Sequence, residues 1–524
     1  MKAAALAWAL FAVAFQPVLR CEQHLAVDEL AAIQGLIQRG NLAEASARIV
    51  TDLQTYPRES AFYNFRGVIE AQQGRYAEAE AAFLRAVEIS PRFTGAYLNL
   101  GRLYQETSAR DPRTPGSQKA IRTYEQVLLF DPANAEAHYQ LALLLLLRDS
   151  AQASLAHLAE LSAAGAGEHS QALALRCAAE AALGRPAQAK ATAQKLLNSP
   201  ELAEADVTTI LPALAAHHLT DLEVQLIEGL AARRLSSGQT LHQLALLYED
   251  AGRLKEARST LETVGSQQAP DVPLLLDLAR VAYKQTDHEG ALGYLAHARD
   301  LEPRNPGIHF FIGVVLIEMD LPFEAEKSLS RAAELDPRNA SVAYSLGAVN
   351  SQMQKWNQAT LWFERYCALK PEDPHGKLAL GSAYFASMAD DKARKELESI
   401  VTESGTAAGA HYYLGRMAAR ANDFDAATKE LRQAVALSPQ YAEAWAELGF
   451  TYLQQEEYAE ARQALERSLA LDPNSFRTNL SLLTLYQRTG DSHAEAQADR
   501  VGKLDKKRSE KASAMLRTIH VQPY

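Results

Sequence analysis

A few residue combinations in this 524-residue chain resemble parts of catalytic or ligand-binding motifs, and each lacks an essential member. His288-Glu289 starts like the HExxH zinc motif, which places two histidines on one helix face, but Leu292 stands where the second histidine is required. The glycine–lysine steps at Gly376 and Gly502 are each followed by leucine, so neither completes a phosphate-binding loop. We therefore predict neither a zinc hydrolase nor a nucleotide-binding loop at these positions.

The remaining residues that could do chemistry are scattered along the chain. There are 14 histidines and 3 cysteines, and no Cys-x-x-Cys pair occurs. A nucleophilic triad is recognised by its geometry, and no combination of Ser, His and an acid stands out in the sequence. The sequence thus predicts that the protein is not an enzyme and uses no metal and no cofactor.

The composition is that of a folded protein rather than a disordered or fibrous one. Hydrophobic residues make up 48% of the chain and charged residues 22%, and the net charge is −11. An acidic balance argues against a general nucleic-acid binder, because contacts with phosphates require a basic excess. With three cysteines, a disulfide framework is not expected. No nucleic acid is therefore predicted among the partners.

The first 20 residues have the pattern of a secretory signal peptide. One lysine precedes an apolar run over residues 3–15, which is too short to span a bilayer but fits the hydrophobic region of a signal. No later stretch approaches the length of a membrane span. We predict an exported protein, periplasmic or extracellular. Two alternatives stay open: a cytoplasmic protein with an amphipathic first helix, and a lipoprotein acylated at Cys21, although Arg20 stands where a small residue is expected.

Prolines mark the ends of successive helical patterns, most often at intervals of 34 residues. They stand at Pro57, Pro91, Pro132, Pro303, Pro337, Pro371, Pro439 and Pro473. An alanine lies twelve residues before each one: Ala45, Ala79, Ala120, Ala291, Ala325, Ala359, Ala427 and Ala461. Twelve residues earlier again, most units carry a small residue: Gly67, Ala279, Gly313, Gly347, Gly415 and Gly449. The chain is therefore built from internal repeats.

This spacing predicts two antiparallel helices per repeat. The two small residues fall where the helix backbones come closest, and the proline ends the second helix because it lacks an N–H donor. Glycines at the midpoint predict left-handed caps on the first helix, as at Gly40, Gly74, Gly184 and Gly252. Asparagines after the proline suit helix N-caps, at Asn134, Asn339 and Asn474.

The repeat resembles the tetratricopeptide repeat, a helix–turn–helix unit of 34 residues. The unit at residues 442–475 shows this most clearly, with Trp445, Leu448, Gly449, Tyr452, Tyr458, Ala461, Leu465, Leu471 and Pro473 at the signature positions of the family, while Ser468 departs from its preferred alanine. The resemblance implies an all-α fold, a right-handed α-solenoid (superhelix) of about fourteen repeats. Their expected starts are residues 26, 60, 94, 135, 170, 204, 238, 272, 306, 340, 374, 408, 442 and 476.

The quality of the repeats suggests the domain organisation. Residues 26–169 hold repeats 1–4, with an insertion in repeat 3 at about residues 106–117. Residues 170–237 hold the degenerate repeats 5 and 6, where Thr208, Thr209 and Pro212 interrupt the helical pattern and a hinge is possible. Residues 238–509 hold repeats 7–14, and residues 510–524 form a basic capping helix or tail.

The resemblance also implies where partners bind, because in such solenoids the first helices line a concave face. Aromatic and basic residues gather there in repeats 8–13, a composition typical of protein-recognition hot spots. The candidates are Arg280, Tyr283, Lys284, Phe310, Phe311, Tyr344, Phe385, Tyr412, Tyr413, Arg416, Arg420 and Phe450. Phe310 and Phe385 in particular also fit simple packing against neighbouring helices. His138, His309 and His411 share the repeat position of Trp445 and are interpreted as packed aromatic rings rather than ligands.

The sequence therefore predicts a non-enzymatic scaffold that binds partner proteins or extended peptides on this concave face. Two other classes stay open. The chain could be a membrane-anchored assembly factor, peripherally attached through Cys21, or an accessory repeat subunit of an enzyme complex such as a glycosyltransferase system.

Overall fold

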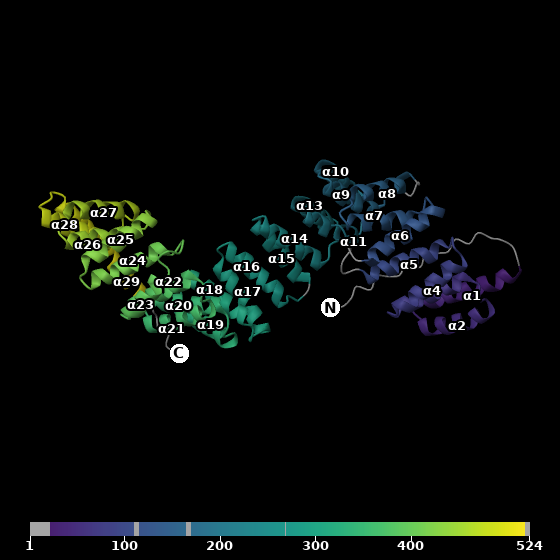
Figure 1. Ribbon diagram of the computed structural model, residues 1–524, viewed down its shortest axis with the longest axis horizontal. Helices are drawn as coiled ribbons and strands as arrows, with labels where there is room; N and C mark the ends of the chain where they lie inside the picture. Colours follow the sequence, from purple (N-terminus) through teal and green to yellow (C-terminus); the bar gives the residue numbers. More distant parts are fainter. Residues whose placement is uncertain (1–20, 109–114, 164–168, 268, 519–524) are drawn as a thin grey trace. The chain divides into compact units, whose positions relative to one another are not determined.

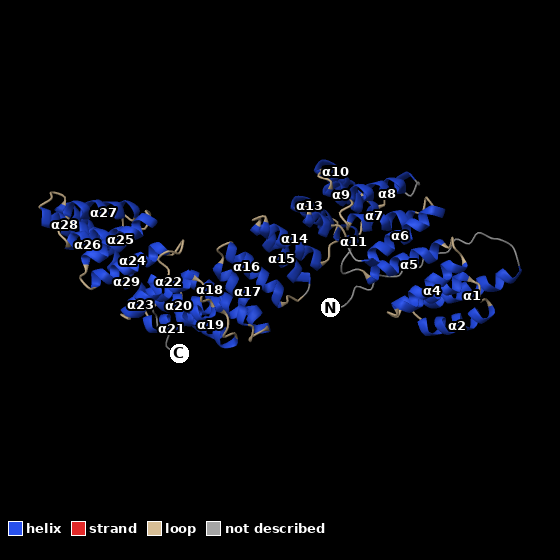
Figure 2. Cartoon of the chain, viewed as in Figure 1, coloured by secondary structure: helices blue, strands red, loops and turns tan. Residues whose placement is uncertain are grey.

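A computed structural model describes residues 21–108, 115–163, 169–267 and 269–518. Residues 1–20, and with them the predicted signal peptide, lie outside the described residues, as does part of the predicted insertion in repeat 3. All regular structure in the described ranges is helical, without strands (Figure 2). The chain divides into two compact units, residues 1–268 and 269–524, which are considered separately.

The first unit consists of short helices connected by tight turns (Figure 1). They are α1 (Cys21–Gln38), α2 (Leu42–Thr55), α3 (Ser60–Gln72), α4 (Tyr76–Ile89), α5 (Thr94–Thr107), α6 (Pro115–Phe130), α7 (Ala135–Leu146), α8 (Ala151–Ala163), α9 (Ser170–Ala182), α10 (Pro186–Asn198), α11 (Glu204–Thr208), α12 (Leu211–Ala216), α13 (Thr220–Ala232), α14 (Gly238–Asp250) and α15 (Leu254–Gln267).

The second unit continues the same pattern. Its helices are α16 (Val272–Lys284), α17 (His288–Leu301), α18 (Pro306–Glu318), α19 (Pro322–Leu335), α20 (Ala340–Gln352), α21 (Trp356–Leu369), α22 (Pro374–Ala386), α23 (Asp390–Glu398), α24 (Ala407–Arg420), α25 (Phe424–Leu437), α26 (Ala442–Gln454), α27 (Tyr458–Leu471), α28 (Phe476–Thr489) and α29 (Ala494–Thr518). From repeat 2 onward, each predicted repeat start lies within one residue of the start of a first helix.

The predicted helix ends are observed, with one correction. Gly40, Gly74, Gly184 and Gly252 all have positive φ angles, and the second helices end two residues before the repeat prolines. Asn134 and Asn339 cap α7 and α20 by accepting backbone N–H groups. The prediction for Asn474 was wrong. Ser475 caps α28 instead, accepting the N–H of Thr478, while the backbone N–H of Asn474 donates to Asp472.

The small residues lie where the two helices of a repeat meet, as predicted. A Cβ placed on Gly67 would come within 2.5 Å of the Phe83 ring, and one on Gly449 within 2.6 Å of Leu465. The alanines that precede the repeat prolines by twelve residues are fully buried. Overpacking such contacts typically costs about 1–3 kcal/mol. The repeat signature is thus mainly a statement about packing between paired helices.

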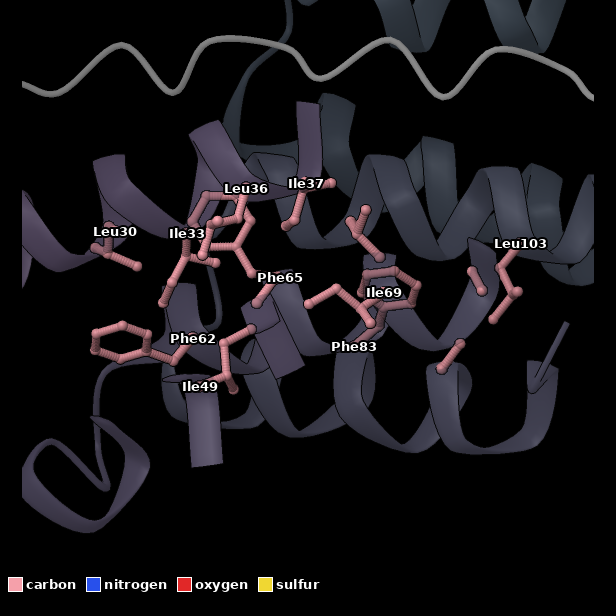
Figure 3. Packing of buried hydrophobic residues seen from close by; sticks show 14 of the residues in the cluster. Leu30, Ile33, Leu36, Ile37, Ile49, Phe62, Phe65, Ile69, Phe83 and Leu103 are labelled. Carbon is pink, nitrogen blue, oxygen red and sulfur yellow. The ribbon is translucent and has the colours of Figure 1, made fainter. Parts of the chain in front are cut away.

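In the first unit, the hydrophobic core is shared between neighbouring repeats. In repeats 1–3, side chains from α1 to α5 form one cluster that includes Leu30, Ile33, Ile49, Phe62 and Phe83 (Figure 3). Each repeat therefore buries its apolar face partly against its neighbours, which is the expected energetics of a solenoid.

Repeat 6 departs from the regular pattern. Its first helix is divided into α11, of five residues, and α12, of six, with Thr209 and Ile210 between them. The break falls where Thr208, Thr209 and Pro212 interrupt the sequence pattern. Its second helix, α13, contacts α10, the second helix of repeat 5. A Cβ on Gly229 of α13 would lie 2.4 Å from Leu197 of α10, so the two second helices approach closely here.

The C-terminal helix continues past the last repeat. α29 extends to Thr518, and its described basic residues at Lys503, Lys506 and Lys507 are exposed. Arg508 lies 4.3 Å from the centre of the Phe476 ring. Among the described residues, no helix is long and apolar enough to cross a membrane.

Candidate functional site

The first helices of the second unit form a distinct face. Four pairs of consecutive first helices contact one another directly: α18–α20, α22–α24, α24–α26 and α26–α28. No consecutive pair of second helices in the described part of this unit makes contacts of similar extent. The first helices therefore lie on the inner side of the local stack, as expected for this type of repeat. We call their surface the first-helix face.

In repeats 8–10, several predicted site residues already have partners within the protein. Arg280 pairs with Asp277 on its own helix at 2.7 Å. The rings of Tyr283 and Phe311 meet edge to face, with their centres 5.8 Å apart. Of the other three candidates here, Lys284 is exposed, Phe310 is half-buried against the core, and Tyr344 is 38% exposed. This stretch offers an aromatic surface whose arginine already has a counter-charge.

Two predicted binding residues are buried, which corrects the expectation that they present open surface. Phe385 and Tyr412 are each 8% exposed. Phe385 packs against Tyr413, with ring centres 5.7 Å apart, and Tyr412 packs against Tyr413 and Tyr441. The two guanidinium groups of Arg416 and Arg420 lie over the Phe385 ring at 4.8 and 4.1 Å. The buried aromatic rings therefore pack underneath the arginine side chains.

The predicted arginines of repeat 12 differ in their partners. Arg420 forms an ion pair with Asp390 and donates to the carbonyl of Phe385 at 3.1 Å. Arg416 forms an ion pair with Glu447, with Nε 3.1 Å from Oε1. Arg420 is thus held by the end of α22 and the start of α23 in the preceding repeat, whereas Arg416 is held by the following repeat.

The structure adds two residues that the sequence analysis missed, Glu447 and Arg477. Arg477 donates a hydrogen bond from Nη2 to Oε2 of Glu447 at 2.7 Å, and its Nη1 forms an ion pair with Oε1 at 2.6 Å. The Glu447 side chain is 4% exposed, while those of Arg416 and Arg477 are 30% and 50% exposed. We call Arg416, Glu447 and Arg477 the Arg–Glu–Arg cluster. Its members come from three consecutive first helices, α24, α26 and α28 (Figure 1).

Burial and charge act in opposite directions on the central carboxylate. Burial is the largest influence and raises the pKa of Glu447 above its ordinary value, while Arg477 and Arg416 act to lower it. Burial also raises the pKa of Tyr412 to about 12. The cluster therefore places a charge inside the protein at an energetic cost that only the two arginines offset.

An apolar patch adjoins the cluster. The guanidinium of Arg477 lies 5.5 Å from the centre of the Phe450 ring, which is half-buried. Leu480, one turn after Arg477 on α28, is 43% exposed. The first-helix face of repeats 12–14 thus combines partly exposed, ordered guanidinium groups with exposed apolar surface.

The predicted packed histidines have polar partners of their own. His138 and His309 bind the carbonyls of Pro132 and Pro303 through Nε2, each at 2.9 Å, and Trp445 donates to Pro439 at 3.0 Å. In this position each side chain satisfies the carbonyl of the proline six residues earlier. His411 differs: residue 405 is a glycine rather than a proline, and the His411 ring contacts Oε2 of Glu430 at 2.7 Å.

No other feature of the described residues forms a clear chemical site. No group of three or more His, Cys, Asp or Glu side chains is arranged to hold a metal ion among them. Cys177 is buried and Cys367 half-buried, and burial raises the pKa of Cys367 to about 11, which makes this thiol a poor nucleophile. A cavity of about 60 Å³ between α7, α9 and α11 has Tyr139 and Asp206 in its wall.

Comparison with known proteins identifies the repeat. Two tetratricopeptide repeat family models match residues 30–92 and 418–483. No curated protein sequence matches the chain significantly. Solved structures with a similar fold include yeast Tom70, at 17% identity and a TM-score of 0.36 over 89% of this chain and 98% of that one. Another is Pseudomonas aeruginosa pilF, at 24% identity and 0.33 over 38% of this chain and 92% of that one. At these values neither likeness indicates a partner.

Proposed function

This chain belongs to the tetratricopeptide-repeat proteins, and on that premise we propose that it is a non-enzymatic scaffold that binds partner proteins or extended peptides. The proposed binding surface is the first-helix face of repeats 12–14. The observation that carries the proposal is the Arg–Glu–Arg cluster beside the exposed Leu480. Arginine is enriched among the few residues that dominate the energetics of protein interfaces.

The arginine side chains of this surface are already ordered in the free protein, which favours it as the binding site. Arg416 and Arg477 are already fixed by Glu447, and they lie against the rings of Phe385 and Phe450. Side chains that are ordered in the free protein lose little entropy when a partner arrives, so more of the contact energy contributes to affinity.

A binding function without catalysis agrees with the extent of the predicted repeats along the chain. The repeats predicted from the sequence cover residues 26–509, and on that prediction no internal stretch is left for a separate catalytic domain. Export of the chain is part of the same proposal and depends on the signal-like residues 1–20. An exported scaffold would meet its partners outside the cytoplasm.

The test compares two variants of the full chain as baits in a lysate of its own source. Arg477→Gln with Leu480→Ser alters the proposed surface and leaves the Arg416–Glu447 pair intact. Arg467→Gln with Lys429→Ser is the matched control, because both residues are exposed on second helices. We expect partners to be recovered with the wild type and the control and lost with the first variant. Recovery of the same partners by all three baits would refute the proposed surface.

A further inference from the structure

The Arg–Glu–Arg cluster has unequal charges. Two guanidinium groups share one carboxylate, and neither Arg416 nor Arg477 pairs with another acidic side chain in the described ranges. Glu443, one turn before Glu447 on α26, is exposed, and neither ion pair of the cluster involves it. The cluster therefore holds one positive charge that the protein itself does not neutralise.

The hydrogen-bonding capacity of the arginines is also only partly used. A guanidinium has five N–H donors in a rigid planar arrangement that matches a carboxylate. Glu447 accepts one hydrogen bond, from Nη2 of Arg477, and forms ion pairs with Nη1 of Arg477 and Nε of Arg416. The Arg416 and Arg477 side chains are 30% and 50% exposed, so further donors face solvent.

We propose that the Arg–Glu–Arg cluster binds one carboxylate of an acidic, extended partner segment, with a neighbouring large apolar side chain of that segment packed on Phe450 and Leu480. This inference rests on the proposed function and specifies the chemistry of the partner. The carboxylate supplies the missing negative charge and accepts N–H donors from both arginines, which is a charge-assisted geometry. Glu447 then acts as the positioning residue that fixes the two arginines and limits their excess to one charge.

Two substitutions at the cluster have opposite expected effects, which makes the inference sharp. Arg477→Gln removes the excess charge while the Arg416–Glu447 pair stays. Glu447→Gln keeps the shape of the side chain and raises the excess from one charge to two. A purely structural role for the cluster predicts that both substitutions weaken binding. A carboxylate site predicts that the first weakens and the second strengthens it.

The experiment uses the full chain and a displayed library of short random peptides. Selected peptides are synthesised with each acidic residue intact or replaced by its amide, Asp→Asn or Glu→Gln. Dissociation constants are then measured for the wild type, Arg477→Gln, Glu447→Gln and the exposed control Arg467→Gln. Free and amidated C-termini distinguish a side-chain carboxylate from a terminal one, and either source supports the inference.

We expect one acidic residue whose amide form binds the wild type about tenfold more weakly, a difference of about 1.4 kcal/mol. We expect Arg477→Gln to abolish that discrimination and Glu447→Gln to strengthen binding, with the control unchanged. Amide and acid peptides that bind equally, while Leu480→Ser still weakens both, would overturn this inference and leave the proposed function standing. Peptides unaffected by both Leu480→Ser and Arg477→Gln would overturn the proposed binding surface, and this inference with it.

Discussion

Repeats 8–10 and repeats 12–14 share the same repeat architecture on the first-helix face, but their arginines are paired in different ways. In repeat 8, Arg280 is neutralised by Asp277 on the same helix. In repeats 12–14, Arg416 and Arg477 depend on a single carboxylate from the helix between them. The Arg280–Asp277 pair is neutral and lies within one helix. The Arg–Glu–Arg cluster links three repeats and has one positive charge more than it has negative charges. The comparison teaches that binding capacity lies in how charges are shared between repeats rather than in how many arginines a face carries.

The largest effect is expected from removing both arginines of the cluster. Arg416→Ala with Arg477→Ala leaves the buried carboxylate of Glu447 without a partner, and such a loss costs roughly 3–5 kcal/mol. Hydrogen exchange of α26 amides should accelerate accordingly. Adding Glu447→Leu should recover most of the loss, because a buried charge is then no longer unpaired. Without that recovery, the charge argument would be wrong.

Packing, unlike charge, should respond equally in both stretches. Gly313 faces Leu329 in repeat 9 as Gly449 faces Leu465 in repeat 13, and an added Cβ would come within 2.5 Å and 2.6 Å of these leucines. We expect Gly313→Val and Gly449→Val to destabilise their own repeats by about 1–3 kcal/mol each. Urea unfolding followed by local hydrogen exchange measures both. A large difference between them would show that the two stretches differ in backbone packing as well.

Alkaline pH should destabilise the fold around Tyr412, whose ring packs beneath the Arg416 side chain of the cluster. Burial raises the pKa of Tyr412 to about 12, above its ordinary value of 10.0. The folded protein therefore holds this proton more tightly than the unfolded chain, and the stabilisation, present below pH 10, is lost as the pH rises from 10 towards 12. Unfolding measured across this interval should be less sensitive to pH in Tyr412→Phe. An unchanged pH profile would contradict the buried position of Tyr412.

The smallest effect is expected at Arg280. Its ion pair with Asp277 is partly exposed, and such pairs contribute about 0–1 kcal/mol. Arg280→Ala should therefore change thermal stability little and leave the affinity of selected acidic peptides unchanged. If it weakens those peptides as much as Arg477→Gln does, binding extends over both stretches and the contrast between them fails.

The fold could be predicted from the sequence because each repeat signature reflects a local contact. Gly67, Gly313 and Gly449 mark close helix approaches, and Gly40 marks a left-handed cap. These requirements recur with a fixed period, so one well-formed unit identifies the others. The error at Asn474 arose because Ser475, the next residue, is also a good N-cap.

The candidate site was harder to predict because it depends on pairing across repeats. Phe385 and Tyr412 have the residue types of binding anchors, yet they are buried under arginine side chains. Glu447 was overlooked as one acid among many on a helix. Its signal was a spacing: Arg416 precedes it by 31 residues and Arg477 follows it by 30, slightly less than one repeat length. That offset places charges from adjacent first helices together.

The most direct test of the central claim is hydrogen exchange of the full chain with and without a bound acidic peptide. Binding on the first-helix face of repeats 12–14 predicts slower exchange in α24, α26 and α28, with α16, α18 and α20 unchanged. Slower exchange confined to the second helices α25 and α27, or to α16–α20, would contradict the account.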